Sequence, residues 1–175
     1  MNRLGLIALV LFAGSVGSAV AQSTEPAVEA PAAGTFNAER WQVLKSTGEG
    51  FAGIRSRSGA DLVLLMCIAK DSIVTLTFHP APALGLSNPP QVASLAFDGE
   101  TQIGMDLAAR KALDGSILFV LHDNEPSFRA AIRKLETARD LEVTVLQGGT
   151  EQSRHQFSLK GSSDAISPVL GLCGQ

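Results

Sequence analysis

Short apolar runs separated by polar or turn residues dominate the chain. Two of the strongest, "DLVLLMCIA" (61–69) and "SIVTLTF" (72–78), are separated only by Lys70-Asp71, and this spacing is typical of a tight β-hairpin. A third run, "SILFVLH" (116–122), has the composition of a strand buried on both faces. These runs predict that strands dominate the fold.

Turn signals divide the remaining strands. Asp98-Gly99 predicts a hairpin turn inside "VASLAFDGETQIGM", and Gly148-Gly149 predicts another after "LEVTVLQ". The proline-rich "HPAPALGLSNPP" (79–90) breaks the sheet and predicts a long connection.

The clearest helix follows the 116–122 strand. Asp123 or Asn124 can cap it, and Pro126 suits its first turn. One apolar stripe runs along it, formed by Phe128, Ala131, Ile132, Leu135 and Ala138. The other side is basic, with Arg129, Arg133, Lys134 and Arg139. Because acidic Glu136 and Asp140 interrupt this basic side, we interpret it as a solvated outer face rather than a docking surface.

The chain ends in "FSLKGSSDAISPVLGLC" (157–173), which predicts a strand that turns into a short helix. Gly161 permits the turn, and Ser162 or Ser163 can cap the helix. Pro168 is expected in the first turn, or else to bend the segment. Together the elements predict an α+β domain, mainly antiparallel, built as a sandwich or a strongly twisted sheet with the amphipathic and C-terminal helices at one side.

Two cysteines, Cys67 and Cys173, occur in the chain. If the chain is exported into an oxidising compartment, an even number of cysteines predicts a disulfide, here between an early strand and the terminal helix. A cross-link closing so long a loop stabilises a fold by on the order of 4–5 kcal/mol.

The first residues have the pattern of a secretory signal. A basic start at Arg3, an apolar stretch and a closing Ala19-Val20-Ala21 predict a secretory signal over 1–21. Residues 22–35, rich in Pro, Ala and Glu, then predict a flexible leader, and 36–175 a single β-rich domain. We therefore expect a soluble periplasmic or secreted protein with no transmembrane segment after cleavage.

Charge narrows the classes of partner. The formal net charge is −3 and becomes −4 once Arg3 is removed. The chain thus has neither the positive field that nucleic acid requires nor a polybasic cluster for anionic lipid.

No catalytic constellation emerges from the sequence. His79, His122 and His155 stand at separate strand ends, and although His122-Asp123 could supply two metal ligands, the spacing of a zinc site is absent. Ser163 lies at a strand-to-helix turn, but the flanks are not those of G-x-S-x-G, and helix capping explains it better. We therefore assign no catalytic, cofactor-binding or metal-binding residue and expect a protein that is not an enzyme.

The order of these elements is familiar. A tryptophan at the start of the domain, an early-strand cysteine, an Asp-Gly hairpin, "FRAAIRKLETARDLEVTV" and "FSLKGSSDAI" follow one another. This layout resembles small exported bacterial envelope proteins of the invasion-associated locus B type, although those carry further cysteines. The resemblance implies a non-enzymatic, β-rich envelope protein.

The leading functional hypothesis is an exported protein that binds an envelope protein or a small ligand. Loops on rigid scaffolds often carry binding, so the 79–90 connection is the candidate binding loop. Its candidate residues are His79, Pro80, Pro82, Leu84, Leu86, Asn88 and Pro89. Two alternatives stay open: a small periplasmic hydrolase using His122, Asp123 or Ser163, and a purely structural envelope protein. The oligomeric state does not follow from the sequence.

Overall fold

The computed structural model describes residues 35–81, 90–102, 105–112 and 115–175. The predicted signal, nearly all of the predicted leader, and Pro82, Leu84, Leu86, Asn88 and Pro89 of the candidate loop lie outside these ranges.

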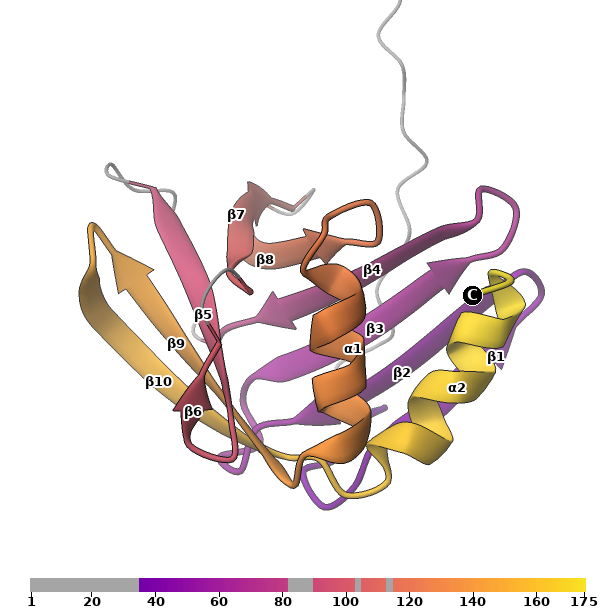
Figure 1. Cartoon of the computed structure of the whole chain (residues 1–175), viewed down its shortest axis with the longest axis horizontal. Coiled ribbons are helices and arrows are strands. Elements are labelled where there is room, and N and C mark those ends of the chain that lie inside the picture. Colours follow the sequence, from indigo (N-terminus) through magenta and orange to yellow (C-terminus); the bar gives the residue numbers. More distant parts are fainter. Residues whose placement is uncertain (1–34, 82–89, 103–104, 113–114) are drawn as a thin grey trace, which may run out of the picture.

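Within these ranges, ten strands form one open antiparallel sheet (Figure 1). They are β1 (Gln42–Ser46), β2 (Glu49–Arg55), β3 (Leu62–Ile68), β4 (Ile73–His79), β5 (Gln91–Phe97), β6 (Glu100–Thr101), β7 (Leu107–Lys111), β8 (Ile117–His122), β9 (Asp140–Gln147) and β10 (Thr150–Ser158). Their order is β1-β2-β3-β4-β8-β7-β5-β9-β10, with β6 paired to β5. The predicted α+β class is confirmed, and of the two expected forms the domain takes the single sheet.

The predicted turns are confirmed. Strands β3 and β4 form the expected hairpin, with Cys67 opposite Val74. Asp98 takes a left-handed φ of 50° and Gly99 follows at 85°, which allows the tight β5–β6 turn. Gly148 and Gly149 also have positive φ and join β9 to β10.

The sheet is bent so that its two halves approach each other. The backbone N–H of Arg57, in the β2–β3 loop, donates to the carbonyl of Gln156 on β10 at 2.8 Å. Phe78 of β4 lies 5.1 Å from the His155 ring and 6.0 Å from the Phe157 ring, measured between ring centroids. The main core therefore fills the inside of the bend, between β2–β4 and β9–β10.

Strict alternation divides the strand side chains between two faces. On β3, Val63, Leu65 and Cys67 belong to the main core inside the bend, whereas Leu62 and Leu64 join a smaller outer cluster. Phe36 and Phe51 complete that outer cluster. Both faces of β3 are thus buried, which explains its continuous apolar run.

Helix α1 (Phe128–Thr137) buries the predicted stripe of Phe128, Ala131, Ile132 and Leu135. The predicted cap is wrong, however. The helix begins after Ser127, which makes no side-chain cap hydrogen bond, and Pro126 precedes it. The reason is that the Asp123 carboxylate accepts from the backbone N–H of Val74 and so ties β8 to β4 instead.

Helix α2 (Ser162–Leu172) corrects two further expectations. Its N-cap is Gly161, in the left-handed conformation, and neither serine caps the helix. The Ser162 hydroxyl instead donates to the carbonyl of Leu135 at 2.6 Å and joins α2 to α1. Of the two alternatives for Pro168, the first is wrong, since Pro168 lies inside the helix and not in its first turn. The buried Ala165, Ile166 and Val169 hold both sides of it against the core.

The predicted disulfide is confirmed. Cys67 and Cys173 are joined, with Cα atoms 6.1 Å apart and a sequence separation of 106. It ties the end of α2 to β3, and both helices lie over the same face of β1–β4 (Figure 1). Among the described residues, neither helix has the length and apolar character needed to span a bilayer.

Candidate functional site

A groove of about 500 Å³ runs between α1 and the end of α2. Both helices bury their apolar stripes in the core, and the side chains at the edges of those stripes form the groove. Its lining residues are Phe128, Arg129, Ile132, Arg133, Leu170, Gly174 and Gln175. The volume lies within the range usual for small-molecule sites.

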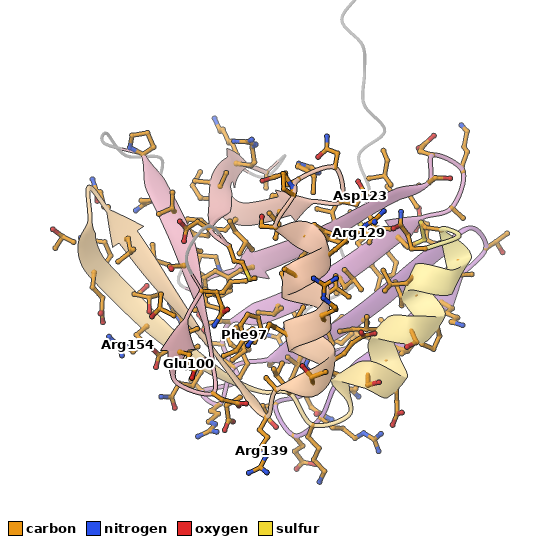
Figure 2. All side chains as sticks on the ribbon, viewed as in Figure 1. Phe97, Glu100, Asp123, Arg129, Arg139 and Arg154 are labelled. Carbon is orange, nitrogen blue, oxygen red and sulfur yellow. A yellow bond between two sulfur atoms is a disulfide. The ribbon has the colours of Figure 1, made fainter. Side chains whose placement is uncertain are left out.

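The groove combines an apolar floor with a basic rim. Phe128 and Ile132 are 2% and 7% exposed and form the floor with the partly buried Leu170. Arg129 and Arg133 are exposed and lie one helical turn apart, so both guanidinium groups can reach one ligand. Arg129 lies on the side of α1 that faces α2 (Figure 2).

Neither of these two arginines belongs to an ion pair in the part of the chain that the structure describes. Arg154 on β10 is different, since it pairs with Glu142 at 3.0 Å and with Glu151 at 2.7 Å. Neither guanidinium group of Arg129 and Arg133 therefore has a described carboxylate within ion-pair distance, and both remain available to an acidic ligand beside the apolar floor.

The disulfide and a glycine place the wall that α2 contributes to this groove. Cys173 stands between two lining residues, Leu170 and Gly174, and anchors them to β3. Gly50 on β2 lies under the helix end, where an added Cβ would meet the Leu172 side chain at 2.5 Å. The Leu172 side chain thus packs directly over the Gly50 backbone, where α2 approaches β2.

The structure places only part of the candidate binding loop. His79 ends β4, where its Nε2 lies 3.0 Å from the Thr77 hydroxyl, and Pro80 is buried. The rest of that loop lies outside the described residues, so its predicted role stays a prediction.

The residues proposed for a hydrolase are not brought together by any contact within the described ranges. The backbone N–H of His122 donates to the Glu125 carboxylate, and Asp123 accepts from Val74. Ser163 is exposed in the first turn of α2, on a different element. Within the same ranges, no group of three or more His, Cys, Asp or Glu side chains could hold a metal ion.

A different polar chain joins the two halves of the bent sheet. Asp61 Oδ2, in the β2–β3 loop just before β3, lies 2.9 Å from Nδ1 of His155 on β10. Nε2 of the same ring lies 2.8 Å from the Ser153 hydroxyl. The Phe78 ring packs 5.1 Å from the imidazole and limits its rotation. Asp61, His155 and Ser153 thus form one hydrogen-bonded series.

The Asp61 carboxylate is the centre of this network. Burial raises its pKa, but hydrogen bonds from the Ala81 N–H, the Ser56 hydroxyl and the His155 ring lower it more, so that the pKa falls below its ordinary value of 3.8. The bond from Ala81 N to Asp61 Oδ1 is 2.9 Å long. Asp61 is therefore ionised at neutral pH although it is only 3% exposed.

This network was not predicted from the sequence. Ser153 and His155 are two residues apart on one strand, so their side chains lie on the same face and a contact between them could have been predicted. Their partner Asp61 lies in the β2–β3 loop, and no local pattern connects it to β10. Only the bend of the sheet brings the three together.

Comparison with protein-family models, curated proteins and solved structures finds no match to this chain. The resemblance to the invasion-associated locus B type therefore stays a prediction.

Proposed function

We propose that this chain is an exported binding protein and that the groove between α1 and α2 takes a small amphipathic anion. The apolar tail of the ligand would lie on Phe128, Ile132 and Leu170, and its acidic headgroup between Arg129 and Arg133. The observation that carries the proposal is the pair of arginines without an ion-pair partner beside a buried apolar floor.

The size of the groove favours a small ligand over a folded protein partner. Seven residues line it, whereas a standard protein–protein interface takes about 20–30 residues a side. Arginine also suits the headgroup, because its planar fork donates two parallel hydrogen bonds to a carboxylate.

Calorimetric titration with decanoate tests this function. Burial of about six CH₂ groups contributes roughly 5 kcal/mol at about 0.8 kcal/mol each. With the arginine contacts added, we expect a dissociation constant between about 10 µM and 1 mM. Decyltrimethylammonium has the same tail and the opposite charge, and we expect it to bind at least about 10-fold more weakly.

Paired variants locate the site. Replacing both groove arginines, as Arg129→Gln with Arg133→Gln, should weaken decanoate binding about 10-fold or more. Arg110→Gln with Lys111→Gln removes the same charge from β7, away from the groove, and should change the affinity less than about twofold. Equal binding of the anion and the cation, or equal losses in the two double variants, would contradict the proposal.

A further inference from the structure

The series Asp61–His155–Ser153 has the connectivity of an acyl-transfer triad. In such a triad a carboxylate orients one ring nitrogen of a histidine, and the other nitrogen takes the proton of a serine hydroxyl. Both distances required for this, 2.9 Å and 2.8 Å, are present. We propose that Ser153, His155 and Asp61 form a site that hydrolyses small neutral esters, an activity separate from binding in the α1–α2 groove.

The hydrogen bonds select the required tautomer. An ionised Asp61 accepts from Nδ1–H, and in that tautomer the lone pair on Nε2 faces the Ser153 hydroxyl. Asp61 is a positioning residue, held in turn by the Ala81 N–H. The Asp61 carboxylate and the Phe78 ring together hold the imidazole in one orientation before a substrate arrives.

His155 and Ser153 are both more exposed than Asp61. The side chain of Asp61 is 4% exposed, that of His155 is 11% exposed, and Ser153 is partly exposed. A β-bulge lies immediately before Ser153, where the register of β10 on β9 shifts between Glu151 and Ser153. Bulges occur frequently beside active sites because they redirect a neighbouring side chain.

The surroundings of Ser153 indicate the substrate class. Its partner across the ladder is the fully buried Val145. Arg154, one residue along the strand, is paired with Glu142 and Glu151, so its charge is compensated. Because this neighbouring charge is compensated, an uncharged ester suits the site better than a charged one.

The reaction balances with water as the second reactant. Ser153 Oγ bonds to the carbonyl carbon while its proton moves to His155 Nε2. The bond from that carbon to the alcohol oxygen then breaks, and the proton on Nε2 passes to the departing alcohol. Water next attacks the acyl-serine and gives a proton to Nε2, and release of the carboxylic acid returns the proton to Ser153 Oγ.

Covalent labelling tests the proposal on the purified, disulfide-bonded protein. A fluorophosphonate should modify Ser153, located by peptide mass spectrometry, and hydrolysis of p-nitrophenyl acetate should follow the same site. Ser153→Ala should abolish the label and lower the rate at least about 100-fold, as should His155→Gln. Ser163→Ala removes an exposed serine elsewhere and should leave both unchanged.

Asp61→Asn separates positioning from folding. The variant should lower kcat about 100-fold or more with little change in KM, and its pH–rate profile should differ from that of the wild type. Circular dichroism confirms that each variant is folded before it is assayed. Absence of the label from folded wild type, a label on another residue, or hydrolysis that survives Ser153→Ala would overturn the proposal. None of these results depends on decanoate binding, so the two proposals fail separately.

Discussion

Two regions of the molecule are held together by different interactions. The helical face is the side of the sheet that α1 and α2 cover, and the seam is the contact between Asp61, just before β3, and His155 on β10. On the helical face, apolar side chains of α1 and α2 pack on the sheet, and a disulfide fixes the last turn of α2 to β3. At the seam, one buried carboxylate collects hydrogen bonds from a backbone N–H, a serine and a histidine.

The two kinds of contact respond differently to change. Apolar packing and a disulfide are non-directional or covalent, and neither depends on mild changes of pH. A buried carboxylate is stable only when all of its hydrogen-bond donors are present. Once it is protonated, those donors no longer have a charged acceptor and the network is weakened. We therefore expect the helical face to respond to reduction and the seam to respond to acid.

The largest effect is expected from removal of the disulfide, as Cys67→Ala with Cys173→Ala. The loop that it closes spans 106 residues, and the free energy of unfolding should fall by about 4 kcal/mol. Urea denaturation measures this loss, and reduced wild type serves as the control. A loss below about 1 kcal/mol would show that packing alone holds α2.

The next largest effect on stability is expected from truncation of the Asp61 side chain at the seam. Asp61→Ala leaves the Ala81 N–H and the His155 ring without their acceptor and should cost about 3 kcal/mol. Asp106→Ala, at an exposed position before β7, is the matched control and should change stability by no more than about 0.5 kcal/mol. Similar losses in the two variants would remove the distinction drawn for the seam.

Acid sharpens the same contrast. Because folding lowers the pKa of Asp61, the unfolded chain binds more protons near and below its ordinary pKa of 3.8. The contribution of Asp61 is fully present above that pKa and is lost as the pH falls through the lower pKa of the folded state. Between pH 6 and pH 3, stability should therefore fall more steeply in the wild type than in Asp61→Asn. Parallel urea-derived profiles for the two proteins would count against an ionised Asp61 at the seam.

The smallest effect on stability is expected at the groove rim. Arg129→Gln with Arg133→Gln removes two exposed charges that have no described ion pair and should change the free energy of unfolding by no more than about 0.5 kcal/mol. The same double variant should bind decanoate about 10-fold more weakly. A stability loss above about 1 kcal/mol would indicate a structural role for these arginines.

A difference between local and long-range contacts also decides what could be predicted from the sequence. The stripe on α1, the β3–β4 hairpin and the Cys67–Cys173 bridge follow from local period, turn residues and the single available pairing. The helix caps did not follow, because Asp123 and Ser162 have long-range partners, Val74 and Leu135, that compete with capping.

The candidate site was predictable only in part. The arginines of α1 were interpreted from the sequence as part of a solvated outer face, because their place beside an apolar floor depends on Leu170 and Gly174 from the other helix. The Asp61–His155 contact depends on the bend of the whole sheet. Contacts set by topology rather than by local period leave no pattern in a single sequence.

The most direct measurement is an NMR titration of the ¹⁵N-labelled protein with decanoate. If the groove binds amphipathic anions, the amide signals of residues 128–133 and 170–175 will shift and saturate together, while those of β1 and β10 stay in place. Saturating shifts that lie elsewhere, or no shifts at millimolar decanoate, would contradict the assignment of binding to the α1–α2 groove.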